Sequence, residues 1–175
     1  YGMGVAAGDY DNDGNVDIYL GNFGENVLYR NIGDGTFENV SVSAGVADRR
    51  WATSCAFSDT DRDGFLDLYV ANYHDFSYEN HGVCSEGGSG LQLYCGPEAF
   101  DGVGDVLFRN SGNGKFVDVT ESVGLLREDG KELGVVFGDV DADGDSDLYL
   151  ANDKTLNFLF LNSGDGNFSE VGLIS

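Results

Sequence analysis

The sequence is 175 residues long, and its 41% apolar and 13% aromatic content excludes a disordered chain as the first interpretation. Thirty-one acidic residues against nine lysines and arginines give a formal net charge of −22, which repels the phosphates of nucleic acid and of anionic lipids. No apolar run of about 18 residues is present, so we expect neither nucleic-acid binding nor direct membrane insertion. The first residues contain neither an initiator methionine nor a signal-peptide pattern, so we expect a segment of a longer chain.

The chain alternates short apolar runs with glycine-rich turns, which predicts an all-β fold. An apolar strand at 4–8 enters an acidic loop, and Ile18-Tyr19-Leu20 leaves it as the second strand. A third strand at 27–29 turns at Asp34-Gly35, a dipeptide that accepts the positive φ of tight hairpins, and a fourth strand begins at Phe37. Continuous apolarity in the second and third strands indicates sheets that are covered on both faces, with the aromatic residues in the core.

This unit recurs twice, and a period of about 50 residues is typical of propeller blades. The third strands of the later copies lie at 106–108 and 158–160, and their fourth strands begin at Phe116 and Phe168. The second copy contains roughly 29 extra residues, an insertion at about 75–102 between its second and third strands. We therefore expect three blades, at 1–48, 49–127 and 128–175.

Each copy contains one acidic loop of the form D-x-D-x-D-G-x-x-D: loop 1 at 9–17, loop 2 at 59–67 and loop 3 at 139–147. Four carboxylates cannot converge within nine residues without a counter-charge, because two like charges 4 Å apart cost about 4 kcal/mol at an effective dielectric constant of 20. Calcium accepts six to eight oxygens in flexible geometry, which fits the side chains at positions 1, 3, 5 and 9 and the backbone carbonyl at position 7. The predicted ligands of three calcium ions are therefore Asp9, Asp11, Asp13, Asn15 and Asp17; Asp59, Asp61, Asp63, Phe65 and Asp67; and Asp139, Asp141, Asp143, Asp145 and Asp147.

Glycine at position 6 (Gly14, Gly64 and Gly144) permits the positive φ that folds each loop back over an ion. An EF-hand needs a bidentate carboxylate at position 12, but Leu20 stands there in loop 1 and an apolar residue in the other two. The alternative is a set of solvated turns without metal, and three complete copies in register disfavour it.

The three units resemble FG-GAP or VCBS repeats, the calcium-loop blades of integrin α-subunit propellers. The order of the segments NVLYRN, GDGTF and YCGP is similar to proteins carrying ASPIC/UnbV regions, including the cartilage acidic protein group. The resemblance implies three four-stranded antiparallel blades of a larger, seven-bladed propeller of the integrin α N-terminal type. It also implies calcium between the first two strands of a blade and an extracellular role in adhesion or ligand binding.

The insertion combines unlike side chains, and long loops on repeat scaffolds often carry recognition. Its candidate partner-facing residues are Tyr78, His81, Glu86, Tyr94, Glu98 and Asp101. A passive loop, held by a disulfide between Cys84 and Cys95, is the alternative. Cys55 is expected to be a buried free cysteine, and His74 and His81 lack the spacing of a zinc site.

A disulfide and millimolar-range calcium sites both indicate an oxidising compartment, namely the extracellular space, the cell surface or the periplasm. We expect a non-enzymatic scaffold that binds a protein or glycan ligand, with calcium mainly structural. The alternative is a carbohydrate-active enzyme such as a calcium-dependent polysaccharide lyase. It is disfavoured because Arg30, Arg109 and Lys115 occupy repeat positions with an expected structural role, and because no motif of hydrolytic or phosphoryl-transfer chemistry is present.

Overall fold

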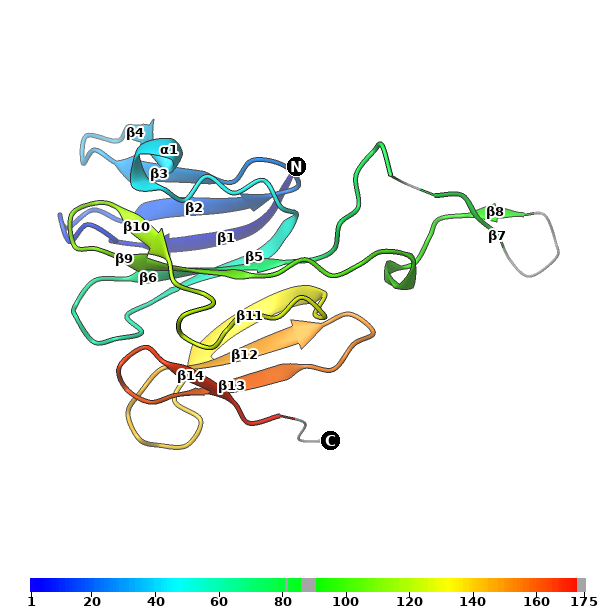
Figure 1. Ribbon diagram of the computed structural model, residues 1–175. Helices are drawn as coiled ribbons and strands as arrows, with labels where there is room; N and C mark the ends of the chain where they lie inside the picture. Colours follow the sequence, from blue (N-terminus) through cyan, green and yellow to red (C-terminus); the bar gives the residue numbers. More distant parts are fainter. Residues whose placement is uncertain (81, 86–90, 173–175) are drawn as a thin grey trace.

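The computed structural model describes residues 1–80, 82–85 and 91–172, and they form an all-β structure as predicted. Three four-stranded antiparallel sheets follow one another as propeller blades (Figure 1). Only two short helical segments occur within the described residues, α1 (Ser41–Ala44) and the 3-10 turn η1 (Pro97–Ala99). No helix of the described part is long and apolar enough to cross a membrane.

Each blade is built from one copy of the repeat, and the fourth strands begin at the phenylalanines that the sequence predicts. Blade 1 consists of β1 (Gly2–Gly8), β2 (Asp17–Asn22), β3 (Val27–Asn31) and β4 (Phe37–Asn39). Blade 2 consists of β5 (Ala52–Ser58), β6 (Asp67–Asn72), β9 (Val106–Asn110) and β10 (Phe116–Asp118). Blade 3 consists of β11 (Glu132–Gly138), β12 (Asp147–Asn152), β13 (Phe158–Asn162) and β14 (Phe168–Glu170).

The register is the same in all three blades. Tyr19 pairs with Ala6, Tyr69 with Ala56, and Tyr149 with Val136 across the first two strands. The first strand of each blade also carries a bulge at its second residue, as between Gly2 and Gly4. Three sequence copies therefore produce three copies of one backbone.

The core lies between the blades rather than within them. One cluster joins Tyr19 and Leu28 of blade 1 to Val70 and Val106 of blade 2, and a second cluster makes the equivalent joint between blades 2 and 3. Every residue of β6 is buried, because blade 2 is covered on both faces. Burying one such apolar side chain stabilises the fold by about 1.5–3 kcal/mol.

Tyr149 departs from the prediction that the aromatic residues of the second strands lie in the core. Its side chain is 38% exposed, whereas the equivalent Tyr19 and Tyr69 are fully buried. Blade 2 covers Tyr19 and blade 3 covers Tyr69, but Tyr149 faces the outer side of blade 3, where the described residues form no further sheet.

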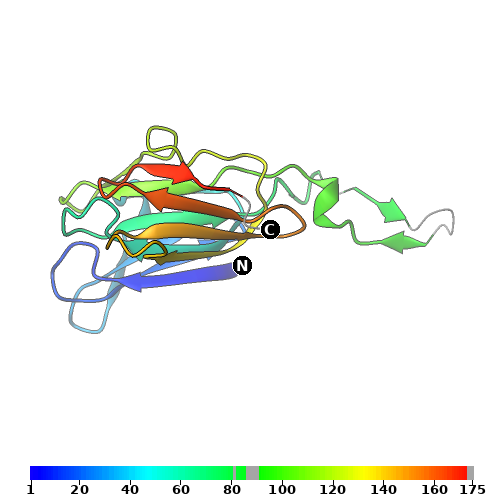
Figure 2. The same ribbon diagram turned by 90° about the horizontal axis from the view of Figure 1, so that it is seen from below.

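The acidic loops and the insertion lie at opposite ends of the blades. The three loops connect the first and second strands of their blades and point to one side, while the segment between β6 and β9 extends from the other (Figures 1 and 2). This segment carries a small hairpin of β7 (Cys84–Ser85) and β8 (Gln92–Leu93). Cys84 and Cys95 form the predicted disulfide, and Cys55 is buried and free as predicted.

Candidate metal centres

Two residues with positive φ shape each acidic loop. The position 6 glycines Gly14, Gly64 and Gly144 have φ of 89°, 89° and 91°, as the sequence predicts. Position 4 also has positive φ, at 57°, 61° and 65°, although its residues carry a Cβ: they are Asn12, Arg62 and Ala142. This second left-handed residue could not be predicted from the sequence, because asparagine is the only one of these three residue types that favours the conformation.

Three carboxylates converge inside each loop. Ligand oxygens of Asp9, Asp11 and Asp13 lie within 4.8 Å of one another. The same holds in loop 2 for Asp59, Asp61 and Asp63, and in loop 3 for Asp139, Asp141 and Asp147. Such groups of carboxylate oxygens are the donors that hard divalent cations prefer, so the residues present fit a calcium ion.

Backbone amides hold the position 1 carboxylate in place. In loop 1 the amide of Asp13 donates to Asp9 Oδ1 at 3.1 Å, and the amide of Gly14 donates to Asp9 Oδ2 at 2.8 Å. Loops 2 and 3 repeat both hydrogen bonds with distances of 3.0–3.1 Å. The glycine therefore turns the chain so that its own amide faces the carboxylate five residues earlier.

The position 9 aspartate joins each loop to the third strand of its blade. Asp17, Asp67 and Asp147 are at most 1% exposed, and their Oδ2 atoms accept the amide of position 2. Their Oδ1 atoms accept the amides of Asn31, Asn110 and Asn162 at 2.8–2.9 Å. A position 9 oxygen belongs to the converging group only in loop 3, so a structural role accompanies the predicted ligand role.

The aspartates of a loop differ in burial, and their pKa values shift in different directions. Burial raises the pKa of Asp17 and of Asp67, because a low dielectric disfavours the charged form. The amide of Asn15 is the main cause that lowers the pKa of the exposed Asp13. Each of loops 1 and 2 thus combines one buried carboxylate with two half-buried ones and one exposed one.

Position 7 side chains pack against the turn between the third and fourth strands. A Cβ added at Gly33 would come within 3.1 Å of Asn15, and one at Gly112 within 3.0 Å of Phe65. Asp145 occupies the same place in loop 3 and forms an ion pair with Arg62. From the sequence, the Asp145 side chain is expected only to add local charge, but it also forms this ion pair and packs against the turn. The position 7 carbonyls stay predicted ligands.

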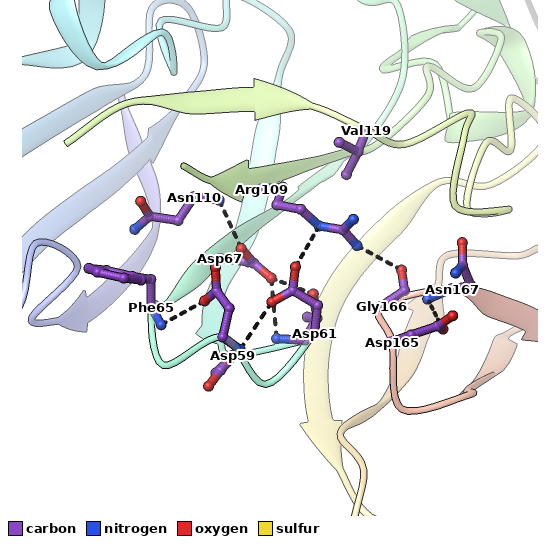
Figure 3. A network of polar contacts seen from close by, with 12 residues as sticks. Asp59, Asp61, Phe65, Asp67, Arg109, Asn110, Val119, Asp165, Gly166 and Asn167 are labelled. Carbon is purple, nitrogen blue, oxygen red and sulfur yellow. Dashed lines mark hydrogen bonds and ion pairs between the residues drawn. The ribbon is translucent and has the colours of Figure 1, made fainter. Parts of the chain in front are cut away.

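Two arginines reach the loop carboxylates from the third strands. Arg30 Nε lies 2.6 Å from Asp11 Oδ2, and Arg109 Nε lies 3.2 Å from Asp61 Oδ2. Figure 3 shows Arg109 between Asp61 and the carbonyl of Gly166, to which its Nη2 donates at 3.0 Å. From the sequence we expected only a structural role for these arginines. Their occurrence at the same position of two repeats could have indicated a contact with the acidic loops.

Hydrogen bonds connect loops 1 and 2 to the blade that follows each of them. Asn12 Nδ2 donates to the carbonyl of Gly64 at 2.9 Å, and Arg62 Nη2 donates to that of Gly144 at 2.6 Å. In the reverse direction, Asn110 Nδ2 donates to the carbonyl of Tyr10 at 2.8 Å, and Asn162 Nδ2 to that of Thr60 at 2.8 Å. The loops therefore fasten neighbouring blades as well as the two strands that they join.

The insertion brings several aromatic rings together beside blade 2. Trp51, Tyr73, His74, Phe76 and Phe100 pack with ring centroids 4.0–6.3 Å apart. They line one side of a groove of about 860 Å³, and the segment of the disulfide lines the other. His74 is stacked on Phe100 and only 6% exposed, and no metal-binding group of the described residues includes it.

The predicted partner-facing residues have different environments. Tyr78 and Tyr94 are exposed. Glu98 pairs with Lys154 of blade 3, and Asp101 donates its amide to Asp75 within the insertion. His81 and Glu86 lie outside the described residues.

Comparisons with known proteins agree with this architecture. A model of an FG-GAP-like repeat matches residues 2–70 and 93–150. Over 97% of this chain, cartilage acidic protein 1 of Homo sapiens is 30% identical and that of Xenopus tropicalis 28% identical. The chain spans about a quarter of the length of these relatives, 25% and 26%.

A solved structure shows weak overall similarity to this chain. It is described as a lectin from Agrocybe aegerita that recognises non-reducing terminal N-acetylglucosamine. The match covers 96% of this chain and 51% of that one, with 17% identity and a TM-score of 0.27.

Proposed function

Because the chain belongs to the FG-GAP-like repeat family, we propose that it is a calcium-stabilised, non-enzymatic part of an extracellular propeller that binds a protein or glycan ligand. The observation that carries this proposal is the threefold repetition of one loop geometry. Each loop directs three aspartates toward a common centre, at positions 1, 3 and 5 in loops 1 and 2 and at positions 1, 3 and 9 in loop 3, and all three loops share the amide contacts to position 1.

A calcium ion, when bound, would supply the positive charge that each group of carboxylates needs. Its ligands would be the aspartates at positions 1, 3, 5 and 9 and the carbonyls of Asn15, Phe65 and Asp145. The position 9 aspartate would link the bound ion to the blade, because its carboxylate accepts hydrogen bonds from both the loop and the third strand. Calcium in this proposal fastens blades and takes no part in a reaction.

Two observations support an extracellular location. The disulfide of Cys84 and Cys95 closes a loop of the insertion, and such bridges persist in oxidising compartments. The relatives are named after cartilage, a tissue rich in extracellular matrix, and after their acidity, and this chain also carries a net charge of −22.

The groove of the insertion is the proposed recognition surface. Aromatic rings line it, and the fully exposed Tyr94 is among its lining residues. Aromatic side chains provide large, rigid contact areas to protein and glycan ligands.

An array of glycans and extracellular matrix proteins, probed with the chain in calcium, tests this role. We expect specific binding that decreases at least tenfold in Tyr94→Ala, since this substitution removes an exposed ring from the groove. Val42→Ala, which removes an exposed apolar side chain on blade 1, is the matched control. Equal binding by Tyr94→Ala and the unmodified chain would contradict the assignment of this surface.

A further inference from the structure

The three acidic loops differ in one residue of the adjacent third strand. Arg30 and Arg109 immediately precede the asparagines whose amides bond the position 9 aspartates. In blade 3 the equivalent residue is Leu161. Loops 1 and 2 therefore have a cation from their own blade, and loop 3 has an uncharged side chain in its place.

The arginines act on the position 3 carboxylates mainly by charge. Their Nε atoms lie 2.6 and 3.2 Å from Asp11 and Asp61 but make no aligned hydrogen bond with them. The Nη2 atom of Arg30 donates to Asp13 at 3.2 Å, whereas that of Arg109 is held by Gly166 of blade 3. Each guanidinium thus lies beside the position 3 carboxylate, an expected calcium ligand, without an aligned hydrogen bond to it.

Loop 3 has a different charge balance. Arg62 extends to it from loop 2, but its contacts are with Asp145 and the carbonyl of Gly144. Within the described residues, no ion pair involves Asp139, Asp141, Asp143 or Asp147. The four expected side-chain ligands of loop 3 therefore lack the partial neutralisation that Arg30 and Arg109 give to loops 1 and 2.

We propose that Arg30 and Arg109 set a ranked order of calcium binding, in which loop 3 fills at the lowest calcium concentration and loops 1 and 2 fill later. The inference rests on the proposed function, since it ranks the affinities of the same three sites. The arginines act as internal counter-charges that stabilise loops 1 and 2 before calcium binds.

Two electrostatic effects of the arginines both weaken calcium binding to loops 1 and 2. A guanidinium beside the carboxylates repels an incoming dication, and it also relieves carboxylate repulsion in the calcium-free loop. Both effects reduce the free energy gained on binding. Since these side chains are partly exposed, solvent screens the effect, and we expect a difference of about tenfold in the dissociation constant.

Nuclear magnetic resonance of the full chain labelled with ¹⁵N-glycine resolves the three loops. The amides of Gly14, Gly64 and Gly144 each donate to a position 1 aspartate, so each reports on its own loop during a titration with calcium chloride. We expect the Gly144 signal to respond at the lowest calcium concentration. In Arg30→Leu, the midpoint of Gly14 should fall about tenfold, while the Gly64 and Gly144 midpoints stay unchanged.

Three variants complete the test. Arg30→Lys retains the charge and should keep the Gly14 midpoint high, and Leu161→Arg should raise the Gly144 midpoint. Arg49→Leu removes an exposed cation that forms no ion pair within the described residues, and it should move no midpoint selectively. A higher or unchanged Gly14 midpoint in Arg30→Leu would overturn the inference, because an arginine that orients its carboxylate would strengthen binding. Absence of any response in the three glycines would contradict calcium binding itself, and the ranking with it.

Discussion

Two buried carboxyl groups meet where blade 2 packs on blade 3. Asp105 accepts hydrogen bonds from Tyr69 Oη at 2.7 Å and from the amide of Asn72 at 2.6 Å, and its other neighbour is the Glu132 carboxyl. Both acids are at most 5% exposed. Burial, together with the charge of its partner, raises the pKa of Glu132 to about 9, and burial raises that of Asp105 to about 7. The pair therefore retains protons that the unfolded chain releases near pH 4.

This pair should make stability depend on pH. Because the folded pKa values are raised, the contribution of the protonated pair is complete below about pH 4 and is lost as the pH rises toward about 9. Glu132→Gln removes the ionisable proton, so it should stabilise the chain by about 1–3 kcal/mol at pH 8.5 relative to its effect at pH 5. Urea unfolding in saturating calcium at both pH values measures this difference.

Glu128→Gln is the matched control, since Glu128 is an exposed acid four residues away on the same segment. We expect it to have the same small effect at both pH values. If Glu132→Gln also has the same effect at both pH values, protonation of the Asp105–Glu132 pair does not contribute to stability.

Single residues show how far the sequence predicts the loops. The spacing of aspartates and glycines predicted the converging carboxylates, because the information lies within nine consecutive residues. The left-handed Arg62 and Ala142 could not be predicted, since their conformation is imposed by the loop and not by their own preference. The Asp105–Glu132 pair was also missed, because it joins residues of two blades.

At the scale of elements, an asparagine at the end of each third strand bonds the acidic loop of its own blade. Asn162 is 3% exposed, and its Nδ2 donates to the carbonyls of Thr60 and Ser146. Its Oδ1 accepts the amides of Gly164 and Gly166. One side chain thus bonds loop 2, loop 3 and the turn between β13 and β14.

Asn162→Ala should destabilise the chain by about 2–3 kcal/mol, because it leaves buried backbone groups without partners. Asn31→Ala is the matched control, as Asn31 holds the same place in blade 1 but donates only to Val16 of its own loop. Asn31→Ala should lower the free energy of unfolding by about 1 kcal/mol. Urea unfolding of the two variants compares them, and equal losses would show that the bond between blades contributes nothing beyond the bond within a blade.

In the whole molecule, equivalent residues differ in exposure according to whether another blade follows their own. Position 2 of the loop is 2% exposed at Tyr10 and 1% at Thr60, because the following blade covers it, whereas Val140 of loop 3 is 55% exposed. Tyr149 is exposed on the same face. The outer face of blade 3 therefore corresponds to the faces of blades 1 and 2 that receive the next blade, and the seven-bladed ring stays a prediction.

The sequence also predicted the blades themselves, since a period of 50 residues with repeated strands leaves little choice of architecture. It did not predict the aromatic cluster beside blade 2. Trp51 precedes β5 and Phe100 closes the insertion, and only the folded backbone brings them to the same groove. Contacts within a repeat are thus accessible from the sequence, and contacts between an insertion and a blade are not.

Thermal unfolding with and without calcium measures how far the proposed ions stabilise the fold, because each ion would hold together the carboxylates of a loop that joins two strands of a blade. At a calcium concentration 100 times the dissociation constant, binding should stabilise the fold by about 2.7 kcal/mol per loop. We therefore expect the Tm to fall by about 15 °C or more when excess EDTA replaces about 1 mM calcium. The same Tm in calcium and in EDTA, with no calcium detected in the protein by mass spectrometry, would contradict the account.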